Sequence, residues 1–351
     1  MRIAFVSPFT NTTNRYIDMQ KQLLSDCGFD VKPLNVKSVL TGRAWGIFKR
    51  DNVMAFHWLE TRPYVWRGAN PSLSLKGSVE FLFYVVLIAI ARARVVYFVH
   101  DHAVHDTTGW RKKLSVQLIK LLRALADTRV VHDPSFAGTY QATYLPHPLY
   151  WDDGHTNTKP MPAAARGSEQ TQFGMLGAVR PYKNIHRILE IWPQGVRLMI
   201  RGRATDDYAA QLNEVIARRQ LAPHVAFQSG YMSDEDFAAS LAALDVLILA
   251  HISDSMLVSG AFFEAIGRVS AIWARQSPFI KWAASQLPNA LPFKDDAELV
   301  ERVVGLKSIP ANRGTAEAQA DKALAAIRLF GWKECVRSYS AMLNNPSPKK
   351  N

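Results

Sequence analysis

The stretch FGMLGAVRPYKN occupies residues 173–184 and combines an apolar segment, a glycine turn and a basic segment. Residues 173–176 are predicted as a strand, and a helix is expected to follow the basic segment. Gly177 lets the backbone approach a ligand closely, and the start of the next helix offers free N–H groups to an anion. A strand, a turn and a helix in this order are typical of a parallel α/β sheet.

The same rhythm continues on both sides of this stretch. Towards the C-terminus, strands are predicted at 197–200, 225–228, 246–250 and 270–273. Towards the N-terminus, strands are predicted at 3–7, 53–59, 95–100 and 129–132, with helices at 15–27, 79–91 and 110–126. Strand-helix alternation implies parallel sheets with right-handed crossovers. We therefore expect an α/β protein with two doubly wound, Rossmann-like domains that face a cleft.

The length of 351 residues supports two domains, because single domains usually have roughly 100–200 residues. Residues 152–170 carry Pro, Gly and charged residues without apolar periodicity, which predicts a linker. The expected organisation is a first domain over 1–151, the linker over 152–170, a second domain over 171–329, and a C-terminal helix and polar tail over 330–351.

Composition narrows the class of protein. Two cysteines supply too few thiols for a disulfide framework or a thiolate zinc site, so we expect a cytoplasmic location.

The net charge is +12; the first 150 residues carry 19 basic and 10 acidic side chains, and the rest carry 23 basic and 20 acidic ones. Such a charge favours a polyanionic partner: a nucleic acid, an acidic membrane surface or a phosphorylated substrate. The longest uncharged apolar run, 81–91, is too short to span a bilayer, so no transmembrane helix is expected.

Titratable side chains gather directly after the apolar strand at 95–100. His100, Asp101, His105 and Asp106 stand within seven positions at the end of that strand. Ligands of doubly wound sheets bind at the carboxyl ends of the strands, and His and Asp can act as general bases there. A metal site is the second alternative, although it needs three or four convergent ligands. The third alternative is a polar loop that caps the next helix.

Two segments of the second half are candidates for binding an anion. Arg180 and Lys183 lie three residues apart and can clamp a diphosphate, unless they form an ordinary solvated helix start. Ser259 and Gly260 are expected at a helix entry that binds phosphate, with Glu264 placed to bind sugar or ribose hydroxyls. The alternative is an ordinary helix with an exposed glutamate. Tyr231, after another predicted strand, is a candidate contact for the nucleotide base.

Aromatic and basic residues alternate in the first half. Tyr and Trp suit the membrane–water boundary, and Lys and Arg meet anionic headgroups. The helix at 79–91 belongs either to such a membrane-facing surface or to the core. The candidate membrane or acceptor contacts are Trp58, Tyr64, Trp66 and Arg67.

The three clusters, in this order, resemble those of GT-B glycosyltransferases over most of the chain. Gly177 to Asn184 is similar to the segment whose basic residues hold the donor diphosphate in that family, and residues 259–265 resemble the segment that grips the donor's sugar and ribose. Residues 330–339 resemble the family's last helix, which crosses back onto the first domain. The resemblance implies that the domain over 1–151 faces the acceptor and the membrane and that the domain over 171–329 holds the nucleotide-sugar donor.

Within that fold, residues 55–58 and 100–106 resemble bacterial exopolysaccharide glycosyltransferases of the xanthan mannosyltransferase type. The loop departs from their pattern with Asp101 for Asn, Val104 for Pro and Asp106 for Glu. The resemblance implies a peripheral enzyme at the inner face of the plasma membrane. It would move mannose from GDP-mannose to a polyprenyl-diphosphate-linked saccharide, with no nucleic acid as partner.

The stereochemical expectation rests on one departure. Retaining members of the fold often carry a pair of glutamates, and Met256 stands where the partner of Glu264 would be. We therefore expect inversion, with one base and no metal or other cofactor, because basic side chains and helix N–H groups can offset the leaving charge. The open alternatives are a retaining hexosyltransferase, a nucleotide-sugar epimerase or phosphorylase of the same fold, and a basic nucleic-acid-binding protein.

Overall fold

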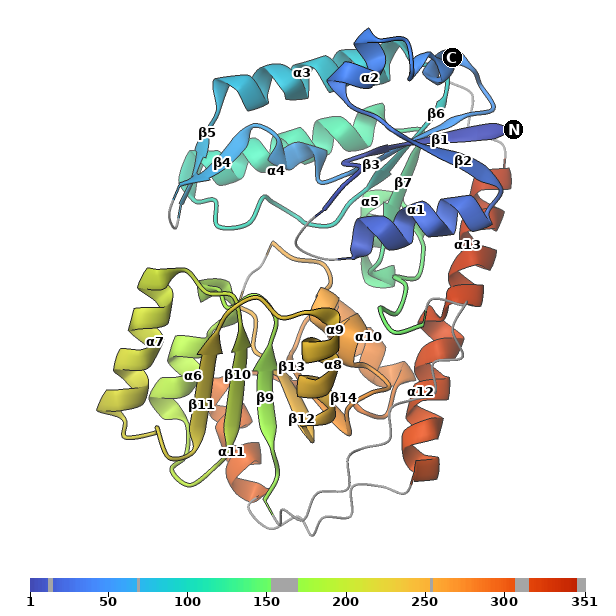
Figure 1. Ribbon diagram of the computed structural model, residues 1–351. Coiled ribbons are helices and arrows are strands. Elements are labelled where there is room, and N and C mark those ends of the chain that lie inside the picture. The colour runs from blue at the N-terminus through green and yellow to red at the C-terminus, as the bar shows by residue number, and fades with distance from the viewer. Residues whose placement is uncertain (12–14, 68–69, 153–169, 253–254, 307–315, 346–351) are drawn as a thin grey trace. The chain divides into compact units, whose positions relative to one another are not determined.

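The computed structural model describes residues 1–11, 15–67, 70–152, 170–252, 255–306 and 316–345 (Figure 1). These residues form two compact units. The first unit holds the described residues up to 152, together with 255–258 and those from 330 onward; the second holds the others. Most of the predicted linker at 152–170 lies outside the described residues.

The first unit is built on a six-stranded sheet in the order β2-β1-β3-β6-β7-β8, with every neighbouring pair parallel. Its first strand therefore lies inside the sheet, between the second and the third. The strands are β1 (Arg2–Ser7), β2 (Phe29–Pro33), β3 (Val53–His57), β6 (Arg94–Phe98), β7 (Thr128–Val131) and β8 (Thr143–Tyr144). A separate antiparallel hairpin consists of β4 (Tyr64–Arg67) and β5 (Asn70–Leu73).

Helices cover both faces of this sheet (Figure 1). They are α1 (Tyr16–Asp26), α2 (Val36–Leu40), α3 (Leu75–Ile90), α4 (Gly109–Leu125), α5 (Ala137–Tyr140) and α13 (Trp332–Asn344), with the short 3-10 helices η1 (Trp45–Phe48), η2 (Leu59–Thr61) and η3 (Pro134–Phe136). Alternation along β6 divides its side chains between two layers: Val95 and Tyr97 join the apolar core with α3 and α4, whereas Phe98 stacks on Tyr339 of α13.

The last helix of the chain is fastened to the first unit by side-chain hydrogen bonds. Trp332 Nε1 donates to Asp26 at 2.8 Å, and the Tyr339 hydroxyl donates to Gln20 Oε1 at 3.0 Å. Arg94, at the start of β6, donates to the carbonyl of Met342 at 2.9 Å. The C-terminal helix therefore belongs to the same unit as the N-terminal strand.

The second unit has a six-stranded parallel sheet in the order β11-β10-β9-β12-β13-β14. The strands are β9 (Phe173–Leu176), β10 (Leu198–Gly202), β11 (Val225–Ser229), β12 (Val246–Leu249), β13 (Ala271–Arg275) and β14 (Ala290–Phe293). The helices are α6 (Ile185–Ile191), α7 (Asp206–Arg218), α8 (Asp234–Ala242), α9 (Gly260–Ala265), α10 (Pro278–Gln286), α11 (Asp296–Gly305) and α12 (Ala316–Phe330), with η4 (Pro181–Lys183) before α6. The strand order reverses between β9 and β12, which makes their carboxyl ends the switch point where doubly wound sheets bind ligands.

The predicted fold class, α/β with two doubly wound parallel sheets, is confirmed. β2, β8, β14 and the β4–β5 hairpin were not predicted from the sequence. Helix α3 was predicted to start at residue 79, whereas Ser74 caps its start by accepting from the Gly77 amide at 3.2 Å. Among the described residues no helix is long and apolar enough to cross a membrane.

Candidate active site

Four buried imidazoles lie at the carboxyl ends of the first sheet, around the ring of Tyr16. His57 ends β3, while His100, His132 and His147 follow β6, β7 and β8. Their ring centroids lie 5.4, 5.1, 5.7 and 5.1 Å from that of Tyr16, in the same order. The strand ends thus gather residues that are up to 131 positions apart around one tyrosine.

Burial keeps these rings in the neutral form, and hydrogen bonds orient them. His132 Nδ1 lies 2.8 Å from the Leu145 carbonyl and donates to it, so its Nε2 accepts from the Tyr16 hydroxyl at 2.7 Å. His57 Nδ1 and His100 Nε2 lie 3.1 Å apart. Burial lowers the pKa of all four rings, that of His132 to about 4. At neutral pH the cluster is therefore an uncharged packing core.

This environment assigns His100 to the interior. It is 9% exposed, and Trp58 stacks on it with ring centroids 4.2 Å apart. Burial first, and the neighbouring His57 next, lower the pKa of His100 well below its usual range. Of the four candidate bases, His100 is the one that Trp58 shields from solvent on one ring face.

A second cluster stands beside this core and is partly open to solvent. His105 Nε2 lies 3.1 Å from the Asp101 carboxylate and donates to it, and His105 Nδ1 lies 2.9 Å from the Ser255 hydroxyl. The Asp101 side chain is 7% exposed and that of His105 31%. An imidazole whose Nε2–H faces a carboxylate keeps a lone pair on Nδ1, so it can accept a proton there.

Electrostatics tune this pair. Burial lowers the pKa of His105, but the Asp101 carboxylate raises it, and the net effect is a pKa above the usual value. Behind the pair, Glu60 is fully buried and accepts a hydrogen bond from the Tyr97 hydroxyl at 2.8 Å. Burial raises the pKa of Glu60 to about 7, against the effect of that hydrogen bond. The cluster therefore holds a histidine and a glutamate that both have raised pKa values.

Ser255 reaches this cluster from a distant part of the sequence. The amide of His102 donates to the Ser255 carbonyl, and Asp101 forms an isolated β-bridge with Met256. Residues 255–258 therefore belong to the first unit, although the sequence analysis placed this segment in the nucleotide-sugar domain. Met256, which stands where a retaining enzyme would have its first glutamate, is held by this bridge.

Asp106, the remaining candidate base, is exposed and has a left-handed backbone with φ of 60°. The structure thus joins Asp101 and His105 through a direct contact and separates His100 into the buried core. Among the described residues, no group of three or more His, Cys, Asp or Glu side chains is arranged to hold a metal ion.

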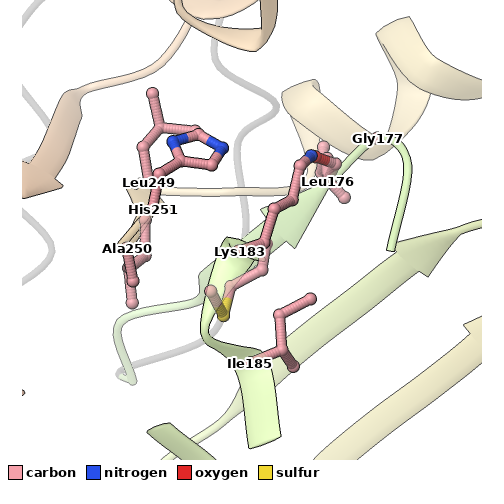
Figure 2. A pocket seen from close by; sticks show the side chains of 9 residues that line it. Leu176, Gly177, Lys183, Ile185, Leu249, Ala250 and His251 are labelled. Atoms are coloured by element: carbon pink, nitrogen blue, oxygen red, sulfur yellow. The ribbon is translucent and has the colours of Figure 1, made fainter. Parts of the chain in front are cut away.

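In the second unit, a small pocket opens at the switch point of the sheet (Figure 2). Its walls come from the end of β9, the end of β12 and the segment around η4. They are formed by Met175, Leu176, Gly177, Lys183, Ile185, Ile248, Leu249, Ala250 and His251. The pocket is therefore lined mostly by apolar residues, with two nitrogen-bearing side chains, Lys183 and His251.

Two glycines allow the backbone to close around this point. Gly177 has a φ of +90°, and Gly202, at the end of β10, has a φ of +145°. A Cβ on Gly202 would lie 1.9 Å from the Gly177 carbonyl oxygen, so a side chain there would force the two strand ends apart. The approach of β9 and β10 therefore requires a glycine at 202, whereas the glycine turn noticed in the sequence, at 177, is favoured by its positive φ.

Lys183 is a buried cation at the pocket wall. Its Nζ donates to the Leu176 carbonyl at 3.1 Å, and the residue is 9% exposed. Within the described ranges no carboxylate is paired with this ammonium group. Burial lowers the pKa of Lys183 to about 8. An anion in the pocket would offset the free-energy cost of burying this ammonium group without a paired opposite charge.

The other predicted donor-binding residues do not line the pocket. Arg180 is exposed, and Tyr231 is 76% exposed on the loop after β11. Ser259 and Gly260 begin α9, and Glu264 is half-buried near Arg268. His251 was not among the residues predicted from the sequence; its ring stacks on Tyr182 with centroids 5.7 Å apart. Its position directly after the apolar strand β12 was the signal that points to it.

The four predicted membrane contacts have different environments. Tyr64 is buried and donates to the Arg111 carbonyl at 3.0 Å, and Trp58 covers His100. Trp66 is 46% exposed on the hairpin. Arg67 ends β4, and its side chain lies outside the described part of the chain.

No protein-family model and no curated protein matches this sequence. Solved structures do. The chain is similar to HepE from Anabaena in complex with UDP and glucose, with a TM-score of 0.65 at 14% identity over 99% of this chain and 100% of that one. It is similar to sucrose-phosphate synthase from Thermosynechococcus elongatus, with a TM-score of 0.66 at 12% identity over 97% and 98%. It is also similar to a glycosyltransferase from Rickettsia africae, with a TM-score of 0.61 at 11% identity over 98% and 100%.

The chain has the GT-B fold. The likeness covers nearly the whole length of each chain, so both six-stranded sheets take part in it. At these identities the comparison establishes the GT-B architecture, and the chemistry has to be argued from the two strand-end sites.

Proposed function

We propose that this chain is a glycosyltransferase that moves a sugar from a nucleotide diphosphate to a hydroxyl group of a saccharide acceptor. The observation that carries the proposal is the buried Lys183 ammonium group, which lines a pocket at the switch point of the second sheet. The fold supports it, because HepE, a GT-B neighbour over its whole length, has been solved with UDP-glucose.

Lys183 is proposed to hold the donor diphosphate. A phosphate oxygen near Nζ would form a charge-assisted hydrogen bond in a site that is already shielded from water. Arg180, Ser259 and Gly260 are proposed to add donors to the same diphosphate, Glu264 to bind sugar or ribose hydroxyls, and Tyr231 to contact the base. The second unit then acts as the donor domain.

His105 is proposed as the base. Its Nε2–H donates to Asp101, which orients the ring and stabilises its protonated form, and its Nδ1 takes the acceptor's proton directly or through the Ser255 hydroxyl. The acceptor oxygen then forms the new bond to the anomeric carbon as the bond to the diphosphate breaks. One base and a leaving group on opposite sides of the anomeric carbon correspond to inversion, in agreement with Met256 at the position of the first glutamate of retaining enzymes. Basic groups offset the leaving charge, and we propose that no metal is required.

The donor and acceptor follow from different arguments. The HepE complexes favour UDP-glucose as the first donor to test, and the resemblance to xanthan-type enzymes makes GDP-mannose the second. The same resemblance favours a polyprenyl-diphosphate-linked saccharide as acceptor, made for an exopolysaccharide at the inner face of the plasma membrane.

Calorimetry with UDP and GDP tests the donor site directly. Lys183→Ala should weaken binding of the preferred nucleotide about 10- to 100-fold, as expected for a hydrogen bond to a charged group. Lys322→Ala is the matched control, because Lys322 Nζ also donates to a carbonyl, that of Ser270 at 3.1 Å, but does not line the pocket. Equal affinity of wild type and Lys183→Ala for the nucleotide would remove Lys183 from the donor site.

The pH dependence gives a second readout in the same experiment. Only protonated Lys183 attracts the diphosphate, and burial lowers the pKa of Lys183 to about 8. The affinity should therefore fall as the pH rises through about 8, until it reaches the roughly 10- to 100-fold weaker binding expected of Lys183→Ala. Lys183→Ala should abolish this decline, whereas Lys322→Ala should retain it.

A further inference from the structure

Helix α3 (Leu75–Ile90) carries apolar side chains around almost its whole circumference. Lys76 and Glu80 are the only charged residues among its 16. One side, with Phe81, Tyr84 and Leu87, packs in the core of the first unit. A helix that is apolar on all sides is normally covered on all sides.

The opposite side of α3 is uncovered in this chain. Leu75, Val79, Leu82, Val86 and Ile90 are 83, 61, 60, 51 and 56% exposed. Their spacing of three and four residues places them in one stripe along the helix. A 16-residue helix is about 24 Å long, so the stripe is longer and more continuous than the scattered apolar residues of an ordinary surface. We call these five residues the α3 stripe.

Exposed aromatic residues lie near both ends of the stripe. At its N-terminal end the β4–β5 hairpin packs against α3 (Figure 1) and presents Trp66, which is 46% exposed. At its C-terminal end the amides of Arg92 and Ala93 donate to the Ile47 carbonyl, and η1 presents Trp45, which is 64% exposed. Tryptophan at the edge of an apolar surface is typical of a membrane–water interface.

The charge around the stripe is strongly positive. Residues 35–121 contain thirteen Lys and Arg but five Asp and Glu. Among those five, Glu60 and Asp101 are buried, and Glu80 is paired with Arg62 at 2.9 Å. Near the C-terminal end of α3 the exposed basic side chains are Lys37, Arg43, Lys49, Arg50 and Arg92.

We propose that the α3 stripe lies flat on an anionic bilayer, with the stripe in the acyl-chain boundary and the basic side chains at the headgroups. The charge selects this occupant: a second copy of the chain would bring two basic surfaces together, whereas an anionic lipid surface complements them. The helix is shorter than the roughly 30 Å hydrocarbon core of a bilayer, which favours lying in its surface. This inference does not depend on the proposed transferase activity.

The test is co-sedimentation of the full-length protein with vesicles of phosphatidylcholine alone or mixed with phosphatidylglycerol. The wild type should bind the anionic vesicles and bind neutral ones more weakly. The triple variant Val79→Ser, Leu82→Ser, Val86→Ser should lower the partition coefficient about a hundredfold, because three apolar side chains are lost from the lipid contact. The matched control is Val304→Ser with Leu324→Ser, which removes apolar side chains that are 44 and 50% exposed on the second unit; it should bind like the wild type.

Two further measurements decide how a negative result is interpreted. An environment-sensitive fluorophore on Val86→Cys should shift to shorter wavelength with anionic vesicles, and one on Leu324→Cys should not. UDP affinity and thermal unfolding of the triple variant should equal those of the wild type, which separates membrane docking from donor binding and from folding. Vesicle binding that survives the triple variant, or a wild-type dimer that the variant converts to monomers without any vesicle binding, would overturn the proposal.

Discussion

In the first unit, four neutral imidazoles surround Tyr16 at the carboxyl ends of the strands, whereas in the second unit the ammonium group of Lys183 lines a pocket at the corresponding edge. Both sheets have six parallel strands, but their orders differ. The direction in which successive strands are added to the sheet reverses between β1 and β3 in the first sheet and between β9 and β12 in the second. The same layered architecture therefore offers two different strand-end environments.

The difference shows how the two units divide the chemistry. Aromatic packing in the first unit excludes water from most of its strand ends and leaves the Asp101–His105 pair at the margin of a neutral core. In the second unit close glycine contacts replace aromatic packing, and a cation is left facing a pocket. A base with an adjacent carboxylate suits proton removal, and a buried cation suits a leaving diphosphate.

The largest expected effect separates the two sites by their kinetics. His105→Ala should lower kcat about 10³-fold, because general base catalysis contributes typically 10²- to 10⁴-fold. The affinity for UDP should stay unchanged, since the proposed donor contacts lie in the second unit. Asp101→Asn should lower kcat and shift the acid limb of the pH–rate profile to lower pH, because the Asp101 carboxylate raises the pKa of His105.

Ser255→Ala sharpens the assignment of the base. If the serine relays the proton, kcat should fall less than in His105→Ala, because a water molecule or the acceptor hydroxyl can replace the serine oxygen. A tenfold loss of UDP affinity in His105→Ala with unchanged kcat would contradict the division between the two sites.

A smaller effect concerns stability in acid. Burial lowers the pKa of His57, His100, His132 and His147, that of His132 to about 4. As the pH falls below about 6.5 the unfolded chain takes up protons that the folded first unit does not. Each histidine should then cost about 1.4 kcal/mol of stability per pH unit, down to its folded pKa.

Hydrogen exchange followed by mass spectrometry at pH 7, 6 and 5 tests this difference, after correction for the intrinsic exchange rate. Peptides from β3, β6 and β7 should lose protection before those from β9, β10 and β12. Loss of protection in both units at the same pH would show that the imidazole cluster does not set the acid sensitivity.

The sequence predicts the strands best where apolar residues run without interruption. β6 and β9 are such runs, and both were expected within two residues of their true bounds. β2 escaped because Asp30 and Lys32 interrupt it, and only its pairing with β1 identifies it as a strand. Helix α3 was read as either core or surface, and it is both: Phe81 and Tyr84 are buried, while Leu82 is exposed.

The candidate site was predictable only where its residues are close in sequence. Asp101 and His105 are four positions apart after one strand, so their contact follows from the loop. Ser255 contacts His105, 150 positions away in the sequence, because the segment that contains Ser255 pairs with Asp101 through Met256. No local sequence pattern predicts that contact. Glu60 was not predicted for a similar reason, since it is buried where η2 packs on α4 and its partner Tyr97 lies 37 positions away.

The smallest effect tests whether Glu60 and His105 titrate together. The Glu60 carboxylate contributes to the raised pKa of His105, and burial raises the pKa of Glu60 itself to about 7. Glu60→Gln keeps an acceptor for the Tyr97 hydroxyl but removes the charge, so the His105 midpoint should fall by roughly a few tenths of a pH unit. NMR titration of the ring protons measures this, with Glu80→Gln as the matched control, because Glu80 pairs with Arg62 instead. Two coupled groups release protons over a wider pH range than one, so Glu60→Gln should also narrow the pH range over which His105 titrates. An equal width and an equal midpoint in Glu60→Gln and Glu80→Gln would mean that Glu60 holds Tyr97 in place and does not affect the pKa of His105.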